Sequence, residues 1–338
     1  MMKAVYLERP EDIYIKEIDE PLCPAGYARV RVRAVGICGS DISAYKGTSP
    51  MCTYPRVIGH EVVGDIVEIN GDSSQLKLGD RVILEPYIYC GRCYPCLNGR
   101  TNSCENLKVL GVHIDGGMTE YILHPVHLIH KLPERLSDEE GVMVEPLSIA
   151  IHALHRLRVK EREHIVIFGG GQIGNLAAQG ALSVGATPIL IDLLDEGLEK
   201  ARDVGIKNVL NPQRDNIIEK IREITCGRMA ECVIEATGSL SAIRTTLDVV
   251  ACTGRIAFVG WPSQEISFPT ALITRKELDV YGSRNSVGEF PDAIDLISTG
   301  KVNVKPVISK VVSLEEIPEY VKILAEEPGR FLKVIGKL

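Results

Sequence analysis

The chain has 338 residues, enough for two domains at roughly 100 to 200 residues each, and 45% of its residues are hydrophobic and 25% charged. These values exclude a disordered chain, a collagen-like fibre and a small disulfide-stapled domain. The 38 basic and 45 acidic residues give a formal net charge of −7 without any run of Lys and Arg that could follow a phosphate backbone, so we expect no nucleic-acid partner.

The sequence does not predict membrane association. No apolar stretch reaches the ~18 to 20 residues that span a bilayer. The first residues, Met1 to Tyr6, alternate as in a strand and lack the apolar region of a signal peptide. We therefore expect a cytoplasmic protein with no membrane partner.

The first 147 residues predict a mostly β domain. Pro and Gly interrupt short runs rich in Val and Ile, and the run 28–35 alternates between polar and apolar residues. Such period-two alternation is typical of an antiparallel strand with one face in water.

Three short motifs in this half carry side chains that can bind a catalytic zinc ion: Cys38, His60 with Glu61, and Glu145. A catalytic zinc takes about three N, S or O ligands and keeps one position open for a substrate oxygen. Taken singly, however, these residues also suit a buried small side chain, a core histidine and an acid at a helix start. Their spacing leaves open whether they meet.

A four-cysteine loop lies between these motifs. Of the ten cysteines in the chain, four fall within fifteen residues: Cys90, Cys93, Cys96 and Cys104. In a cytosolic protein such clustering predicts metal binding before disulfides. Four thiolates suit a closed, structural zinc site. An iron–sulfur cluster is the alternative, because thiolates bind both.

Residues 148–283 predict a doubly wound α/β domain. Apolar strands alternate here with segments of helix length, the pattern of βαβ units and a parallel sheet. The expected strands are 164–168, 188–192, 208–210, 232–236, 255–259 and 278–282.

The first βα turn of this domain carries the pattern G-x-G-x-x-G. Gly169 permits the tight turn, Gly171 lets the backbone approach a pyrophosphate, and Gly174 lets the helix pack against the strand. The following helix N-terminus, at Gln172 and Ile173, offers amide donors to the phosphates. Alone, three glycines at this spacing could equally form an ordinary turn, but the strand and helix around them favour a dinucleotide site.

Asp192 ends the second strand about 20 residues further on, where a carboxylate can accept both adenosine ribose hydroxyls. Leu193 follows, and no Arg stands there to meet a 2′-phosphate, so we expect NAD rather than NADP. The alternative role for Asp192 is a helix N-cap. Small residues at later strand ends are also expected to line the cofactor, although they could equally form turns: Ala236, Thr237, Gly238, Val259, Gly260 and Ser283.

The last residues are too few to form a core of their own. They predict a helix at 291–299, a strand at 307–312, a helix at 314–326 and a strand at 331–335. We expect this segment to return to the β domain. The predicted domains are therefore 1–147 with 284–338, and 148–283.

Together these motifs resemble the zinc-containing medium-chain alcohol dehydrogenases over essentially the whole length, and most closely their sorbitol, threonine and sugar-acid dehydrogenase branch. The resemblance rests on the four-cysteine loop, the glycine loop and the segments 38–41, 59–64, 79–82, 116–121 and 145–147.

The resemblance implies an α/β chain: a GroES-like catalytic domain, a Rossmann NAD domain inserted before its last segment, and an active site between them. It also implies a homodimer or homotetramer. Two zinc ions per chain are expected, one held by the four cysteines and one by Cys38, His60 and a glutamate, either Glu61 or Glu145.

The resemblance further implies an NAD-dependent dehydrogenase acting on a secondary alcohol of a polyol or sugar acid. Zinc would lower the pKa of the alcohol, Ser40 would accept its proton, and the nicotinamide would take the hydride. Many relatives have a histidine where this chain has Ser43, five residues after the zinc cysteine. This departure leaves the proton exit route open.

The substrate is less defined. Residues 282–285 with 290–291 resemble dehydrogenases of hexonates such as L-gulonate or L-galactonate, and Arg284 could pair with a carboxylate, the cofactor or a neighbouring subunit. Tyr45 and His113 are the other candidate substrate residues. L-threonine or a cyclitol is an alternative substrate. A quinone reductase-like relative would lack the zinc residues, and a non-catalytic NAD sensor would not need them.

Overall fold

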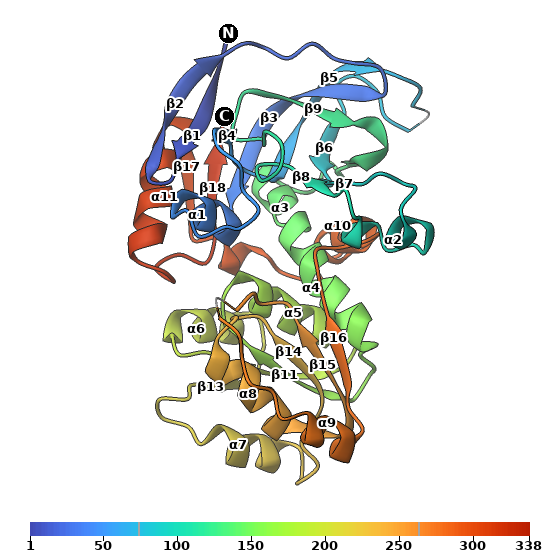
Figure 1. The fold of residues 1–338 in the computed structure, drawn as a ribbon, viewed down its shortest axis with the longest axis vertical. Helices are drawn as coiled ribbons and strands as arrows, with labels where there is room; N and C mark the ends of the chain where they lie inside the picture. Colours follow the sequence, from blue (N-terminus) through green and yellow to red (C-terminus); the bar gives the residue numbers. More distant parts are fainter. Residues whose placement is uncertain (74, 263) are drawn as a thin grey trace. The chain divides into compact units, whose positions relative to one another are not determined.

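The computed structural model describes residues 1–73, 75–262 and 264–338, and these divide into two compact units (Figure 1). The first unit comprises residues 1–145, 290–298 and 308–338, and the second comprises residues 146–289 and 299–307. Each has its own sheet and hydrophobic core. No helix in the described part of the chain is long and apolar enough to cross a membrane.

The first unit is built mainly from antiparallel strands. Its largest sheet has the order β10-β6-β5-β3-β18-β17, with β9 also paired to β3; a second sheet has the order β2-β1-β4, and β7 pairs with β8. The strands are β1 Met2–Arg9, β2 Asp12–Ile18, β3 Tyr27–Ile37, β4 Arg56–Val57, β5 Glu61–Asn70, β6 Arg81–Leu84, β7 Tyr87–Ile88, β8 Lys108–Val109, β9 Tyr121–Pro125, β10 Ile129–Lys131, β17 Lys310–Ser313 and β18 Val334–Lys337.

Strand β3 organises this unit. Ala28, Val30 and Val32 are buried while Arg31 between them is exposed, as the alternation predicts. From Ala34 to Ile37 every residue is buried, and along this stretch β3 pairs with β5 on one edge and with β18 on the other. The C-terminal strand therefore completes the sheet that the N-terminal residues begin.

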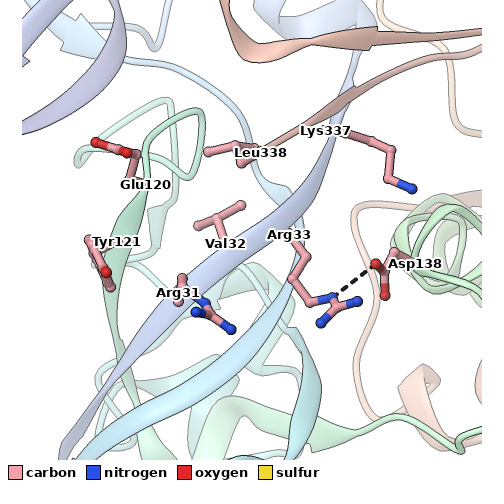
Figure 2. A pocket seen from close by; sticks show the side chains of 8 residues that line it. All are labelled: Arg31, Val32, Arg33, Glu120, Tyr121, Asp138, Lys337 and Leu338. Atoms are coloured by element: carbon pink, nitrogen blue, oxygen red, sulfur yellow. Dashed lines mark hydrogen bonds and ion pairs between the residues drawn. The ribbon is translucent and has the colours of Figure 1, made fainter.

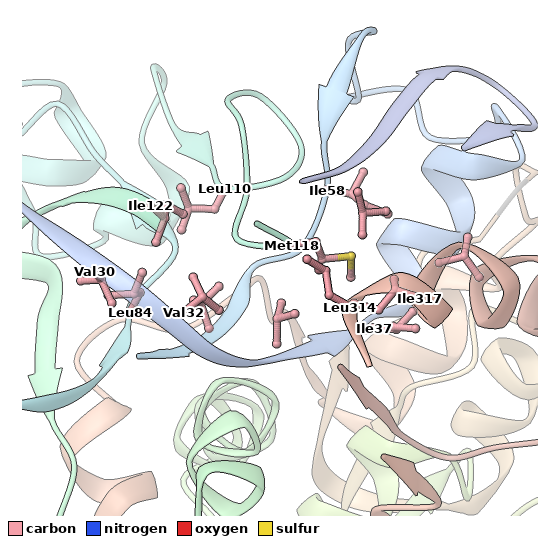
Figure 3. Close-up of a cluster of buried hydrophobic side chains, with 14 of the residues drawn as sticks. Val30, Val32, Ile37, Ile58, Leu84, Leu110, Met118, Ile122, Leu314 and Ile317 are labelled. Carbon is pink, nitrogen blue, oxygen red and sulfur yellow. The ribbon is translucent and has the colours of Figure 1, made fainter. Parts of the chain in front are cut away.

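The core of the first unit joins side chains that are distant in sequence. In Figure 3, Val30 and Ile122 pack in one cluster with Met118 and with Leu314 and Ile317 of the C-terminal segment. The helices of this unit are α1 Gly39–Tyr45, α2 Tyr94–Leu97, α3 Asp138–Val142, α10 Phe290–Ser298 and α11 Ile317–Glu326; helix α4, Val144–Leu157, leads from the first unit into the second.

The second unit confirms the predicted doubly wound domain. Its six parallel strands have the order β13-β12-β11-β14-β15-β16, in which two mononucleotide-binding halves diverge from β11 and β14. The strands are β11 His164–Phe168, β12 Thr187–Ile191, β13 Asn208–Leu210, β14 Ala230–Glu235, β15 Val250–Phe258 and β16 Asp279–Gly282. The helices are α5 Gln172–Ser183, α6 Asp195–Asp203, α7 Ile217–Ile224, α8 Leu240–Val249 and α9 Thr270–Lys276.

Some predicted bounds differ from the structure. The strand expected at 307–312 begins only at Lys310, because residues 305–307 form a 3₁₀ turn, and the strand expected at 331–335 begins at Val334. Strand β15 starts at Val250, five residues early, where a bulge lets it pair with Ala230.

The boundaries of the two units also differ from the predicted domain limits. Residues 284–289 belong to the second unit, because Ser286 bonds to Ser148 at 3.0 Å and Glu289 accepts a hydrogen bond from His152 at 2.8 Å. Residues 299–307 join the same unit, where the Asn303 amide donates to a side chain of α5. These long-range bonds have no signature in the local sequence.

Candidate metal and cofactor sites

Three of the predicted zinc ligands meet in the first unit. Cys38 is the N-cap residue of α1, and His60 and Glu61 lie at the start of β5. One ligand atom of each lies within 4.8 Å of the others, and both His60 and Glu61 are buried. A sulfur, a nitrogen and a carboxylate oxygen at this spacing match the ligand types of a catalytic zinc site.

Asp41, which the sequence analysis gave no role, holds the backbone around this cluster. Its carboxylate accepts hydrogen bonds from the Cys38 amide at 2.9 Å and from the Gly59 amide at 3.1 Å, and it lies 4.0 Å from His60 Nδ1. Burial raises the pKa of Asp41, and the charge of His60 opposes this. One buried carboxylate thus fixes the start of α1 against the start of β5.

Lys333 is a second residue that the sequence analysis missed. Its ammonium donates to both oxygens of Glu61, at 2.7 and 2.6 Å, and to the carbonyl of Ile37 at 3.0 Å. Both side chains of this pair are at most 1% exposed. A Cβ atom on Gly36 would overlap the Glu61 carboxylate, so a glycine is required beneath it. The only local signal was a lysine inside the apolar run 331–335.

Glu145 has a different environment, although its charge acts on the same cluster. Its carboxylate accepts a hydrogen bond from the hydroxyl of Tyr87, another residue without a sequence signal. Burial raises the pKa of Glu145 to about 7, and the charge of Glu61 adds to this rise. The group of three possible metal ligands includes Glu61 and not Glu145, whose carboxylate is hydrogen-bonded to Tyr87.

The charge balance of this cluster suits a bound cation. Lys333 already balances the charge of Glu61, but Cys38, Asp41 and Glu145 add further acidic groups, and burying unbalanced charge costs several kcal/mol per ion. Burial alone would lower the pKa of His60, yet Cys38, Asp41 and Glu145 raise it well above the ordinary value. A bound divalent cation would take the place of the proton that these acidic neighbours hold on the imidazole of His60. Among the described residues, His60 Nδ1 has no hydrogen-bond partner.

Two serines near Cys38 differ in their availability. The Ser40 hydroxyl is buried and has no hydrogen-bond partner among the described residues, so it can bond to a ligand. The Ser43 hydroxyl donates to the carbonyl of Gly39 at 3.0 Å, back along α1. An orphaned buried hydroxyl costs free energy unless a ligand or a water pairs with it, so Ser40 stays a candidate residue of the site.

The four cysteines also come together as predicted. Their sulfur atoms lie within 4.8 Å of one another, with Cys93 Sγ 3.4 Å from Cys96 Sγ and 3.7 Å from Cys104 Sγ. Four sulfurs around one zinc at about 2.3 Å would be about 3.8 Å apart. Ligands of an iron–sulfur cluster bind different irons and spread further, so the spacing favours a single ion. Backbone amides lower the pKa of Cys90 to about 6, which favours a thiolate, whereas burial and the neighbouring Cys93 and Cys104 raise the pKa of Cys96 to about 12.

We expect Cys96→Ser to remove one zinc ion and to destabilise the loop 90–104. Folding of this loop depends on metal binding, since α2 has only four residues and buries none of them. The melting temperature should fall by on the order of 5 °C, and protease should cut the loop first. Calorimetry and limited proteolysis measure both. An unchanged melting temperature would show that the loop folds without metal.

The carboxyl ends of the parallel strands in the second unit lie at one edge of the sheet, where the following loops meet. The Gly169 amide bonds to Ile191 O at 2.8 Å, the Ala236 amide to Phe168 O at 2.9 Å, and the Ser283 amide to Phe258 O at 2.9 Å. These bonds join the ends of β11, β12, β14, β15 and β16. In doubly wound sheets, dinucleotides bind at this edge.

The glycine loop has the geometry that a pyrophosphate requires. Gly169 adopts φ +107°, and a Cβ on Gly174 would overlap the Gly169 carbonyl. A Cβ on Gly171 would meet nothing within 4 Å, so the backbone is open to a ligand at that point. Helix α5 starts with Gln172 and Ile173 directly behind the loop. The loop, with its helix N-terminus, fits a dinucleotide.

Asp192 lies where the sequence predicts it, immediately after β12. Its carboxylate accepts hydrogen bonds from the Gly170 amide and, at 2.7 Å, from the Leu194 amide. It does not cap α6, because the N-cap residue of that helix is Leu194. Each carboxylate oxygen has a second lone pair, so Asp192 can still accept ribose hydroxyls.

Glu235 is a third residue missed by the sequence analysis. Its buried carboxylate accepts from the amides of Thr237 at 2.8 Å and Gly238 at 3.1 Å, and its carbonyl accepts from the amides of Val259 and Gly260. It therefore fixes both later loops expected to line the cofactor. The Ser283 hydroxyl is buried and, among the described residues, has no partner.

Of the candidate substrate residues, Tyr45 and His113 belong to the first unit and Arg284 to the second. Tyr45 packs against the core of the first unit, and burial, with Glu11 and Glu326, raises its pKa. This placement gives Tyr45 a packing role. His113 Nδ1 accepts from the Val109 amide at 3.1 Å, in a turn after β8. Arg284 follows β16 in the second unit.

A cavity of about 410 Å³ lies in the first unit, away from the predicted ligands (Figure 2). Its cations are already paired: Arg33 donates to Asp138 at 2.9 Å, and Lys337 lies 2.8 Å from Glu139. These ion pairs join β3 and β18 to helix α3. The lining residues are Arg31, Val32, Arg33, Glu120, Tyr121, Asp138, Lys337 and Leu338.

Two family profiles match the chain. The alcohol dehydrogenase GroES-like domain matches residues 24–134, and the zinc-binding dehydrogenase domain matches residues 173–299. The chain is 49% identical over 334 residues to an uncharacterised zinc-type alcohol dehydrogenase-like protein of Haemophilus influenzae, covering 98% of both chains. It is 33% identical over 303 residues to an L-galactonate-5-dehydrogenase of Escherichia coli, covering 89% of this chain and 88% of that protein.

Solved structures match over the same length. An alcohol dehydrogenase of Escherichia coli CFT073, solved with NADH, has a TM-score of 0.94 at 32% identity, covering 100% of this chain and 99% of that one. A zinc-binding dehydrogenase of Sinorhizobium meliloti 1021, bound to NADP, has a TM-score of 0.93 at 30% identity with the same coverage. These two structures hold different nicotinamide cofactors, so the preference of this chain depends on its own residues.

Proposed function

The chain belongs to the family of zinc-binding alcohol dehydrogenases with a GroES-like domain, and from this premise we propose that it oxidises a secondary alcohol of a polyol or sugar acid with NAD. The observation that carries the proposal is the group of Cys38, His60 and Glu61, of which the last two are buried, together with the buried Ser40 hydroxyl two residues after Cys38, which has no hydrogen-bond partner among the described residues.

Different residues have different roles in such a reaction. When bound, zinc supplies Lewis acidity toward the substrate oxygen and NAD accepts the hydride. Ser40 Oγ is the group that can receive the hydroxyl proton, and Asp41 holds Cys38 and Gly59 in place. In the second unit, Glu235 fixes the loops at the cofactor edge, so that the ligand meets preorganised amides.

We propose NAD as the preferred cofactor because of Asp192. A carboxylate at this position accepts ribose hydroxyls, whereas it repels a 2′-phosphate and loses its donors. Both carboxylate oxygens are fixed by backbone amides, so Asp192 cannot easily turn away from a phosphate. Zinc is proposed at two sites per chain on the same grounds as above, with four cysteines at one and Cys38, His60 and Glu61 at the other.

The substrate class is proposed from the relatives. A sugar-acid dehydrogenase is among them, and Arg284 in the second unit could pair with a carboxylate. The test is to scan polyols, hexonates, cyclitols and L-threonine for NADH formation by the zinc-loaded protein. We expect turnover with a polyol or hexonate. Binding of NAD without turnover on any of these compounds would overturn the proposal and favour an NAD-sensing regulator.

We expect Ser40→Ala to lower kcat by on the order of a hundredfold, because it removes the hydroxyl that can take the substrate proton. Ser43→Ala is the matched control. Its hydroxyl is bonded to the Gly39 carbonyl and cannot titrate near neutral pH, so kcat should change little. Steady-state kinetics of both variants decide this. Equal losses would mean that the proton leaves through the Ser43 hydroxyl.

A further inference from the structure

The surface beside Asp192 contains a second carboxylate whose role is not explained by the proposed reaction. Asp195 is the first residue of α6, and Arg214 lies in the turn that follows β13. Helix α6 and strand β13 lie side by side in the second unit (Figure 1). The two oxygens of Asp195 accept hydrogen bonds from the two terminal nitrogens of Arg214, at 2.8 and 2.6 Å.

This pair is attached to the cofactor edge. The Asp192 amide donates to the carbonyl of Leu210 at 3.2 Å. Asn211, the next residue, is buried, and its side-chain amide donates to Leu193 O at 3.0 Å and to Asp195 at 3.2 Å. The turn that carries Arg214 is thus bonded to Leu193, which directly follows Asp192, and to Asp195, and Arg214 follows Asn211 by three residues.

A guanidinium in this place is the group that would recognise a 2′-phosphate. Arginine binds phosphate through two parallel N–H donors, and in this structure both of those donors point to Asp195. Arg214 lowers the pKa of Asp195 to about 2, with Asn211 adding to the effect, so the carboxylate is ionised near neutral pH. A charged acceptor for Arg214 is therefore present at that pH.

We propose that Asp195 is a second determinant of NAD preference, because it occupies the guanidinium of Arg214 and so keeps a 2′-phosphate from using it. The inference rests on the proposed function only in assuming a nicotinamide cofactor at this edge. Asp192 disfavours the phosphate directly, while Asp195 engages a guanidinium in the adjoining turn. A change of cofactor would therefore require both carboxylates to be altered.

The test is a binding measurement that needs no turnover. Calorimetry would compare adenosine 2′,5′-bisphosphate with AMP on the full chain. In Asp195→Asn, affinity for the bisphosphate should rise about tenfold, the size of one charge-assisted bond at a half-exposed site, while AMP binding stays unchanged. Adding Arg214→Gln should abolish the gain. In the double variant Asp192→Ala/Asp195→Asn, the gain in bisphosphate affinity should exceed the product of the gains in the two single variants.

Asp279→Asn is the matched control. Asp279 forms a comparable exposed pair with Arg158 at 3.2 Å in the same unit, but it starts β16 and so lies at the opposite edge of the sheet. Asp279→Asn changes the net charge by the same amount as Asp195→Asn and should leave bisphosphate binding unchanged. A gain in this control, or one that survives Arg214→Gln, would overturn the inference as a general charge effect. Failure to reduce NAD would leave this result intact and count only against the proposed function.

Discussion

Replacing Cys38 with Ser is expected to remove essentially all turnover while the fold remains. A serine hydroxyl is not ionised at neutral pH, so the ligand group loses its thiolate and the site loses its metal. Lewis acidity contributes several kcal/mol to such reactions, so kcat/KM should fall by about a thousandfold or more. Cys38 lies at the start of α1, at the edge of the core, and the melting temperature should change little.

Cys52→Ser is the control for this result. Cys52 is also partly buried in the first unit, where its sulfur contacts the carbonyl of Thr53, at 3.8 Å, and the side chain of Tyr54, and it is not in the ligand group. Steady-state kinetics and circular dichroism melting should be measured on both variants. If Cys38→Ser kept more than about a tenth of the activity, the ligand assignment would be wrong.

Lys333→Met is expected to destabilise the first unit by about 3 to 5 kcal/mol. The substitution leaves the Glu61 carboxylate buried without its ammonium, and an uncompensated buried charge is among the most costly single changes. The loss should be largest in metal-free protein, because a bound cation would offset part of the charge. Denaturant unfolding with and without zinc measures the effect.

Two further variants make this prediction specific. Lys337→Met removes a lysine from the same strand, β18, but its partner Glu139 lies near the surface, so the cost should be at most about 1 kcal/mol. Adding Glu61→Gln to Lys333→Met removes the orphaned charge and should recover most of the stability. Equal losses in Lys333→Met and Lys337→Met would contradict a buried ion pair.

Much of the fold follows from local patterns. The strands at 164–168 and 208–210 have the predicted bounds, and α10 differs by one residue from the helix expected at 291–299. The glycine loop also forms as its spacing predicts, because its chemistry lies within ten consecutive residues. Such segments are set by periodicity and by turn residues, which act over short distances.

The supporting residues of the site could not be predicted in this way. Lys333 bonds to Glu61 across 272 positions of sequence, and Tyr87 reaches Glu145 across 58. The sequence shows only that a charged side chain interrupts an apolar run, and the same holds for Glu235 at the end of β14. Which partner a buried charge finds depends on the order of strands in the sheet, and this order is a property of the whole chain.

The zinc content of the purified, active protein tests the central claim most directly. Elemental analysis should find two zinc ions per chain, one of which is lost in Cys38→Ser together with turnover and the other in Cys96→Ser together with loop stability. A fully active protein with a single zinc ion per chain would contradict the assignment of one structural and one catalytic site.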